Sequence, residues 1–281
     1  MYRLLVLDID GTLTNNKKEI TPNTKAAIKK AQEKGVKIVI ATGRPTKGAK
    51  KVAEELNLFE TGGYILSFNG GRITDCKTGE VIFQRVLEKE DVAKIYEIAK
   101  ENKIVMITYE GDTVLMEVEN DEYANLEARL NEMETKLVDS IVDYVDFPVN
   151  KCLMTGDGDY LAGVEQKALA KYRDDYSIFR SEAFFLEFMP KGVDKAKSLE
   201  RLLEYLGCER EEMIACGDGF NDASMIQYAG LGVAMENAKE QVKEVADFIT
   251  KSNEEDGVAY VIERFILEKE IYVVGRKVRK Q

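Results

Sequence analysis

Histidine is absent from the 281 residues of this chain. Without it, the protein cannot build a Ser-His-Asp or Cys-His catalytic centre, and it cannot hold zinc or haem through imidazole. If the protein is an enzyme, its proton transfers must therefore be carried out by carboxylates, lysine, tyrosine or cysteine.

Paired cysteines and long apolar runs are also missing. The four cysteines are Cys76, Cys152, Cys208 and Cys216, and no two of them form a C-x-x-C pair. The sequence therefore predicts neither a zinc knuckle nor a redox motif. Scattered thiols with no signal peptide are typical of the reducing cytoplasm, where we expect the protein. The apolar runs, such as the one at 4–7, have strand length, so no membrane span is expected.

Basic residues are outnumbered, with 40 Lys and Arg against 51 Asp and Glu and a net charge of −11. This balance argues against nucleic acid and anionic membranes as partners. Residues 110–146 hold twelve acidic and two basic residues, so the rest of the chain carries a net charge of only −1. We expect this acidic segment to face solvent, with recognition of hydroxyl or amino groups of a ligand as the alternative. The basic end at 276–280 is expected to be a solvated tail.

What the sequence does contain is an alternation of strand and helix patterns. Up to residue 83, short apolar runs alternate with helical segments, one of which begins at Thr21-Pro22 and stops at Gly35. The alternation resumes with a helix that opens at Lys195. Strands separated by helices predict a parallel sheet with helices on its faces. We therefore expect an α/β fold whose core, residues 1–83 and 189–281, is a Rossmann-like, doubly wound sheet.

Between these two halves the pattern changes. Paired strands follow one another directly, as at 104–109 with 113–118, and helices are expected at 89–101, 120–136 and 161–172. We therefore predict an inserted α+β domain at residues 84–188. Its aromatic residues, Tyr109 among them, are expected in its core, although one of them could face a ligand. The two crossovers, near 82–86 and 187–191, would act as hinges.

Polar clusters stand where ligands bind in sheets of this kind, beyond the carboxyl ends of strands. The first is Asp8-Ile9-Asp10-Gly11-Thr12, after the run at 4–7. Residues two apart in an extended segment point the same way, so two carboxylates can share one site. One could be a nucleophile and the other a proton carrier. The alternative is a solvated Asp-Gly turn.

Two further clusters are suited to an anion. Thr42-Gly43-Arg44 offers a hydroxyl, a bare backbone and a guanidinium to a phosphoryl group, unless it merely connects a strand to a helix. Lys195, in the first turn of its helix, is placed against the helix dipole. That position favours an anionic partner, although a solvated surface lysine is the simpler alternative.

The last cluster is Gly217-Asp218-Gly219-Phe220-Asn221-Asp222, directly after a predicted strand. Hard oxygen ligands without histidine or cysteine indicate Mg2+ rather than zinc. The alternative is a loop that caps the next helix through Asn221 or Asp222.

In this order, on both sides of an insertion, the four clusters resemble the signature motifs of the haloacid dehalogenase (HAD) superfamily of phosphohydrolases. More narrowly, the chain resembles the Cof-type (subfamily IIB) HAD hydrolases, with a C2B cap inserted between the second and third motifs. The resemblance covers essentially the whole chain, and D-x-D-G-T together with G-D-x-x-N-D is its most specific part.

The resemblance implies a role for each matching residue. Asp8 would attack phosphorus and form an aspartyl phosphate, and Asp10 would act as general acid and then as general base. The Mg2+ ligands would be Asp8, the backbone carbonyl of Asp10, and Asp218, with Asp222 supporting them or orienting Lys195. Phosphate or substrate contacts would come from Thr42, Gly43, Arg44, Asn69, Lys195 and Asn221.

We therefore expect a Mg2+-dependent phosphatase that acts on a small phosphorylated metabolite, with a sugar phosphate as the leading class. The carboxylate of Asp10 favours phosphatase over dehalogenase or phosphonatase chemistry. A phosphosugar mutase or another phosphotransferase stays open as an alternative, and so does a non-catalytic regulator that binds a phosphometabolite. The oligomeric state is left open.

Overall fold

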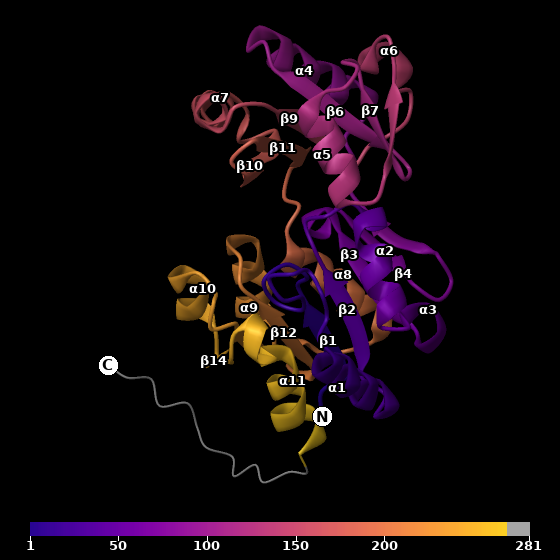
Figure 1. The fold of residues 1–281 in the computed structure, drawn as a ribbon, viewed down its shortest axis with the longest axis vertical. Coiled ribbons are helices and arrows are strands. Elements are labelled where there is room, and N and C mark those ends of the chain that lie inside the picture. The colour runs from indigo at the N-terminus through magenta and orange to yellow at the C-terminus, as the bar shows by residue number, and fades with distance from the viewer. Residues whose placement is uncertain (269–281) are drawn as a thin grey trace.

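The computed structural model describes residues 1–268, so the expected basic tail at 276–280 lies outside the described residues. Two β-sheets, one above the other in Figure 1, organise the fold. The first sheet has eight strands in the order β14-β13-β12-β1-β2-β3-β4-β5. These strands are β1 (Leu4–Leu7), β2 (Lys37–Ala41), β3 (Gly63–Ser67), β4 (Arg72–Asp75), β5 (Val81–Gln84), β12 (Met213–Gly217), β13 (Leu231–Ala234) and β14 (Phe248–Ile249).

The first sheet is doubly wound. Its strands from β14 to β3 are parallel, while β4 pairs antiparallel with both of its neighbours, β3 and β5. Because the strand order runs outward from β1 in both directions, right-handed crossovers place helices on both faces. The accompanying helices are α1 (Pro22–Glu33), α2 (Thr46–Glu55), α3 (Leu58–Thr61), α8 (Lys195–Leu206), α9 (Ala223–Tyr228), α10 (Glu240–Val245) and α11 (Gly257–Ile262). The expected α/β fold with a Rossmann-like sheet is thus confirmed.

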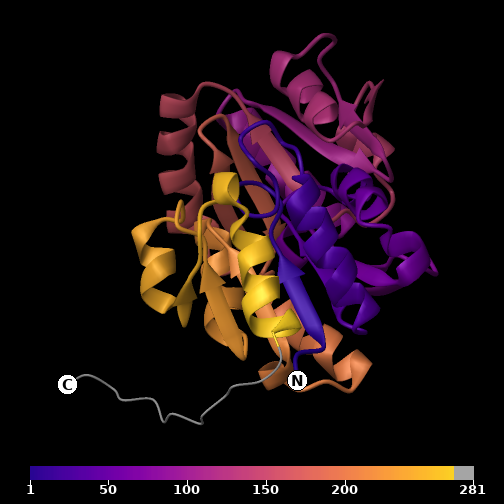
Figure 2. The ribbon, with the colours of Figure 1, turned by 60° about the horizontal axis from the view of Figure 1, so that its bottom comes forward.

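Local sequence explains the first crossover well. The β1 strand is apolar throughout and almost wholly buried, as is typical of a parallel strand covered on both faces. The Thr21 side chain accepts a hydrogen bond from the Thr24 N–H and caps α1, and Pro22 occupies the first helical position. After the helix, Gly35 adopts a φ of 86°, which favours glycine. The first and last helices, α1 and α11, then lie side by side (Figures 1 and 2).

The second sheet has six strands in the order β10-β11-β9-β6-β7-β8. Its strands are β6 (Val105–Glu110), β7 (Thr113–Met116), β8 (Glu134–Leu137), β9 (Cys152–Thr155), β10 (Tyr176–Glu182) and β11 (Phe185–Pro190), with helices α4 (Lys89–Glu101), α5 (Glu122–Leu130), α6 (Ile141–Tyr144) and α7 (Gly158–Tyr172). We call the segment from α4 to β11, residues 89–190, the insert. On β6, Met106 packs on one face with α4, α6 and α7. Tyr109 packs on the other face, in a cluster that includes Phe68 from outside the insert.

The predicted helix at 120–136 exists but is shorter, and the prediction is wrong for the residues after Leu130. The helix α5 begins after Asp121, whose side chain accepts a hydrogen bond from the Ala124 N–H, and it ends at Leu130. Glu132 then turns the chain with a φ of 52°, and the following residues form β8, which pairs parallel to β7. Helix propensity favours Glu, Met and Lys here, but the open edge of β7 overrides it.

The acidic segment at 110–146 does not simply face solvent. Asp112 and Glu132 form ion pairs of 2.8 and 2.9 Å with Lys50 and Lys51 of α2, and these pairs join the insert to the first sheet. Glu127 is buried, because a hydrogen bond and a nearby ammonium group offset the cost of removing its charge from water. The expectation of solvent exposure is therefore wrong for Glu127.

Within residues 1–268, no helix has both the length and the apolarity that crossing a membrane requires.

Candidate active site

Three neighbouring strands end at the site. In the sheet, β1 lies between β2 and β12, and parallel strands bring their carboxyl ends to the same edge. Asp8 follows β1 directly, and its N–H donates to the carbonyl oxygen of Cys216 at the end of β12. Thr42 and Asp218 follow the other two strands. The strand order thus gathers three of the predicted clusters at one edge.

The ammonium group of Lys195 lies at the centre of the site. It donates to Asp8 Oδ1 at 2.8 Å, to Asp222 Oδ1 at 2.6 Å and to the carbonyl oxygen of Ala41 at 2.8 Å. Its side chain is fully buried, so all three of its N–H donors meet protein acceptors. Lys195 is therefore not a solvated surface lysine, and the helix α8 delivers it directly to the carboxylate of Asp8.

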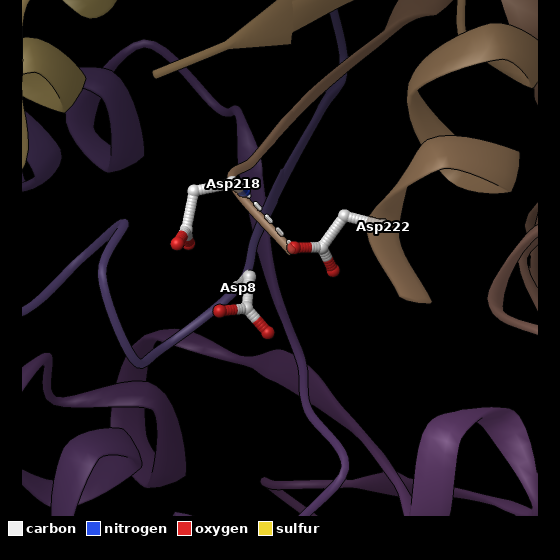
Figure 3. A group of neighbouring side chains, drawn as sticks. All are labelled: Asp8, Asp218 and Asp222. Atoms are coloured by element: carbon white, nitrogen blue, oxygen red, sulfur yellow. Dashed lines mark hydrogen bonds between the residues drawn. The ribbon is translucent and has the colours of Figure 1, made fainter. Parts of the chain in front are cut away.

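Two of these acceptors, Asp8 and Asp222, form a cluster with a third carboxylate, that of Asp218 (Figure 3). Oxygen atoms of Asp8, Asp218 and Asp222 all lie within 4.8 Å of one another. The second oxygen of Asp222 accepts hydrogen bonds from the backbone N–H groups of Asp218, at 3.0 Å, and Gly219, at 2.9 Å. Asp222 therefore holds both Lys195 and the turn that carries Asp218. This use of both its oxygens leaves Asp8 and Asp218 as the freer carboxylates of the group.

The pKa values report an excess of negative charge. Burial, together with the neighbouring Asp222, raises the pKa of Asp8 well above its usual range, although Lys195 opposes the shift. Burial also raises the pKa of Asp218 to about 6, against a hydrogen bond of 2.7 Å from the Thr12 hydroxyl. Burial lowers the pKa of Lys195, but the charges of Asp222 and Asp8 outweigh this effect and raise it, so the amine keeps its proton. One ammonium group does not neutralise three carboxylates, and a further cation would lower the raised pKa values of Asp8 and Asp218.

Asp10 has different partners from Asp8. Arg44 donates to both of its carboxylate oxygens, at 2.8 and 2.7 Å, and Lys18 donates to Oδ1 at 2.8 Å. Burial raises the pKa of Asp10, but these two cations outweigh it and hold the pKa below its ordinary value. In this arrangement Asp10 keeps its charge, and Arg44 is turned toward Asp10.

A third group of predicted residues forms a hydrogen-bonded loop beside the carboxylates. The side-chain amide of Asn221 donates to Asn69 Oδ1 at 2.9 Å, and the N–H of Asn69 donates to the carbonyl oxygen of Thr42 at 3.0 Å. Thr42 is buried, and its hydroxyl accepts a hydrogen bond from the N–H of Arg44. A side chain at Gly43 would come within 3.2 Å of the Asn69 amide, so glycine at this position leaves room for the Asn69 side chain.

All the predicted site residues therefore fall into these three connected groups. Two contacts were not predicted, those of Thr12 with Asp218 and of Lys18 with Asp10. Thr12 belongs to the D-x-D-G-T motif, so its position was a usable signal. Lys18 gave no such signal, because it reaches Asp10 only through a turn. In this turn the Asn15 side chain accepts hydrogen bonds from the N–H groups of Lys17 and Glu19, and Lys18 itself adopts a φ of 63°.

A buried lysine is paired with a strand-end aspartate, beside further carboxylates at the edge of a doubly wound sheet. This arrangement is suited to an enzyme of the phosphoryl-transfer class. Comparisons with known proteins agree. The family model described as "haloacid dehalogenase-like hydrolase" matches residues 5–262. The chain therefore belongs to the haloacid dehalogenase-like hydrolases, and it is a phosphatase of the Cof type within that family.

Three relatives illustrate the match. The 5-amino-6-(5-phospho-D-ribitylamino)uracil phosphatase YcsE of Bacillus subtilis is 30% identical, over 94% of this chain and 96% of that protein. The crystal structure of a haloacid dehalogenase-like hydrolase from Bacteroides thetaiotaomicron is 46% identical, with a TM-score of 0.89 over 94% of this chain and 99% of that one. The HAD subclass IIB sugar phosphatase BT4131 is 26% identical, with a TM-score of 0.76 over 94% and 98%.

Proposed function

We propose that this protein is a Mg2+-dependent phosphatase that hydrolyses a small phosphorylated metabolite through an aspartyl phosphate on Asp8. The observation that carries the proposal is the buried ammonium group of Lys195, fixed between Asp8 and Asp222. A cation held against a carboxylate lets a phosphate dianion approach that carboxylate.

The donor set fits Mg2+. All three residues of the group offer carboxylate oxygens, and burial and the charge of Asp222 raise the pKa values of Asp8 and Asp218. Hard oxygen donors are those that Mg2+ prefers. A side chain at Gly11 would come within 2.4 Å of Asp218 Oδ2, so glycine keeps the space beside this carboxylate open. Asp8, Asp218 and the backbone carbonyl of Asp10 would hold the ion, and Asp222 would support them. When bound, Mg2+ would neutralise charge that develops on the phosphoryl oxygens.

The chain's own residues would act in two steps. The carboxylate of Asp8 attacks phosphorus, the bond from phosphorus to the leaving oxygen breaks, and the leaving oxygen takes a proton from Asp10. A water molecule then attacks the aspartyl phosphate and gives its proton to Asp10, which frees phosphate and restores Asp8. Lys195, Thr42 and Asn221 would hold the phosphoryl oxygens in line throughout.

Asp10 must change partners to donate a proton. With Arg44 and Lys18 both bound to it, its pKa lies below the ordinary value, so it carries no proton near neutral pH. This unprotonated form of Asp10 is the one needed in the second step, in which Asp10 accepts a proton from water. For the first step, we infer that Arg44 or Lys18 leaves Asp10 and turns to the phosphate or the leaving group.

The substrate class and the role of the insert belong to the same proposal. Residues 84–188 would form a cap domain over a catalytic core of residues 1–83 and 189–281, and the cap would select the substrate. A sugar phosphate is the leading class, because YcsE acts on a phosphorylated ribityl compound by its name and BT4131 is described as a sugar phosphatase. A cytoplasmic location and the lack of nucleic-acid or membrane partners are part of the proposal as well.

The test is a panel of phosphate esters, with p-nitrophenyl phosphate and several sugar phosphates, assayed for phosphate release with Mg2+ and with EDTA. We expect turnover that needs Mg2+ and that the Asp8→Asn variant lacks. A folded wild-type protein that releases no phosphate from any member of the panel would contradict the proposal.

A further inference from the structure

A buried aromatic contact connects the insert to the loop that carries Asn69. The rings of Phe68 and Tyr109 lie 6.0 Å apart and meet edge to face at 67°. Phe68 directly precedes Asn69, while Tyr109 lies on β6 in the insert. Both side chains are almost wholly buried in one apolar cluster. A residue of the insert thus packs against the neighbour of a predicted substrate-contacting residue.

The backbone on the Phe68 side of this contact is unusual. Phe68 and Asn69 have φ values of 51° and 53°, a left-handed conformation that bulky side chains avoid unless surrounding contacts impose it. In this conformation the N–H of Phe68 donates to the carbonyl oxygen of Arg44, and the N–H of Asn69 donates to that of Thr42, both at 3.0 Å. Whatever holds Phe68 in place therefore also holds the loop from Thr42 to Arg44.

Tyr109 is itself firmly held. Its hydroxyl donates to Glu127 Oε1 at 2.7 Å, and the ammonium group of Lys151 lies 5.5 Å from the centre of its ring. Lys151 in turn is paired with Glu187 at 2.9 Å. All these side chains are buried, and buried charged groups of this kind fix a neighbour's position better than mobile surface groups do. The charged network thus gives the Tyr109 ring one position.

We propose that Tyr109 is a positioning residue for phosphoryl transfer: by packing on Phe68, it holds Asn69 and the loop from Thr42 to Arg44 in the arrangement that the reaction needs. The proposal rests on the phosphatase function proposed above. It assigns the insert a part in the chemical step that does not depend on contact with the substrate.

The chain provides a matched control in Tyr176. This tyrosine also lies in the insert, is equally buried, meets Phe188 edge to face at 6.3 Å and donates its hydroxyl to Asp91 at 2.9 Å. It packs on the opposite face of the second sheet, away from Phe68. Tyr109→Leu and Tyr176→Leu therefore remove the same ring from similar surroundings.

The experiment measures kcat and KM for p-nitrophenyl phosphate with Mg2+, on proteins whose folding is checked by circular dichroism. Because small displacements of positioning groups lower rates by up to about 100-fold, we expect Tyr109→Leu to lower kcat on the order of tenfold. Tyr176→Leu should stay within about twofold of wild type, and Tyr109→Phe, which keeps the ring, should restore most of the rate. Equal kcat values for the two leucine variants would overturn the proposal, whereas a wild type inactive on every ester of the panel above would instead refute the phosphatase function.

A double-mutant cycle provides a second readout, and its single variant Phe68→Leu tests the same contact even if Tyr109→Leu folds poorly. Phe68→Leu removes the other ring, and it should lower kcat by a similar factor. If the two residues act through one contact, the double variant should lose no more than either single variant. Losses that multiply would show independent effects and would overturn the proposal.

Discussion

Replacing Lys195 with methionine tests whether its amine balances the charge of the active site. The ammonium group lies 2.8 Å from Asp8 and 2.6 Å from Asp222. At an effective dielectric constant of about 20, each such pair is worth roughly 6 kcal/mol before desolvation is subtracted. Since removing one partner of a buried ion pair costs about 3–5 kcal/mol net, we expect Lys195→Met to lower the free energy of unfolding by that amount in EDTA.

Mg2+ should reverse much of this loss. A cation at 100 times its Kd stabilises a folded protein by about 2.7 kcal/mol, and the gain should be larger in Lys195→Met because its carboxylates carry one more uncompensated charge. The assay is urea unfolding followed by circular dichroism, with Mg2+ and with EDTA. Turnover should be lost in both conditions, because Mg2+ does not replace the amine as a phosphate ligand.

Lys151→Met is the matched control for this experiment. Lys151 is also buried, at 2.9 Å from Glu187 and 3.9 Å from Glu127, but these carboxylates lie in the insert, apart from the group of Asp8. Removing the Lys151 amine should lower the free energy of unfolding by a similar amount, and Mg2+ should not restore that loss. If Mg2+ stabilises both variants to the same extent, the assignment of the metal site to the carboxylates around Lys195 is refuted.

Three further predictions concern the metal, the proton carrier and the contact of the insert with α2. The pKa values of Asp218 and Asp8 are raised to about 6 and about 8, so Mg2+ must displace protons from these ligands at lower pH. Calorimetric Mg2+ affinity should therefore rise with pH up to about pH 8, more steeply below about pH 6 than above it, and then level off. A flat profile would contradict the pKa assignments. Arg44→Met should raise the pKa of Asp10, since only one of its two cations, Lys18, would then oppose the effect of burial on this pKa. We expect the alkaline limb of the pH profile of kcat/KM to move up by about one pH unit or more. An unchanged limb would count against Asp10 as the general acid. In Gly48→Ala, the new methyl group would meet Asn131 Oδ1 at 2.2 Å and push α5 away from α2. We expect kcat to fall on the order of tenfold, although alanine favours a helix. An unaltered kcat would argue that the position of the insert does not matter to the reaction.

The sheet and the main clusters could be predicted because their signals are local. An apolar run such as β1 makes a buried parallel strand, and polar residues at the ends of such strands must share an edge. The roles proposed for Asp8 and Lys195 come from the resemblance of the ordered motifs to the haloacid dehalogenase signature, and the structure brings these two side chains together. Each of these inferences depends on a short stretch of sequence and on rules of sheet topology.

The remaining features depend on contacts between distant segments. The strand β8 forms because the edge of β7 is open to it, although the sequence from Glu132 onward favours a helix. Lys18 meets Asp10 through a turn that no motif marks. Glu127 appeared to be one of twelve acidic residues in a solvated segment, and only the fold brings Tyr109 and Lys151 to it. Side-chain partners of this kind are decided by packing, so the sequence alone did not predict them.

The central claim is that Asp8 carries the phosphoryl group during the reaction. A single turnover of a phosphorus-labelled substrate, quenched in acid, should leave label on the protein. An aspartyl phosphate is an acyl phosphate, so hydroxylamine should release the label, and peptide mapping should locate it at Asp8. Asp8→Asn, folded and supplied with Mg2+, should carry no label. Turnover by the wild-type protein without a labelled intermediate, or with label at another residue, would contradict the claim.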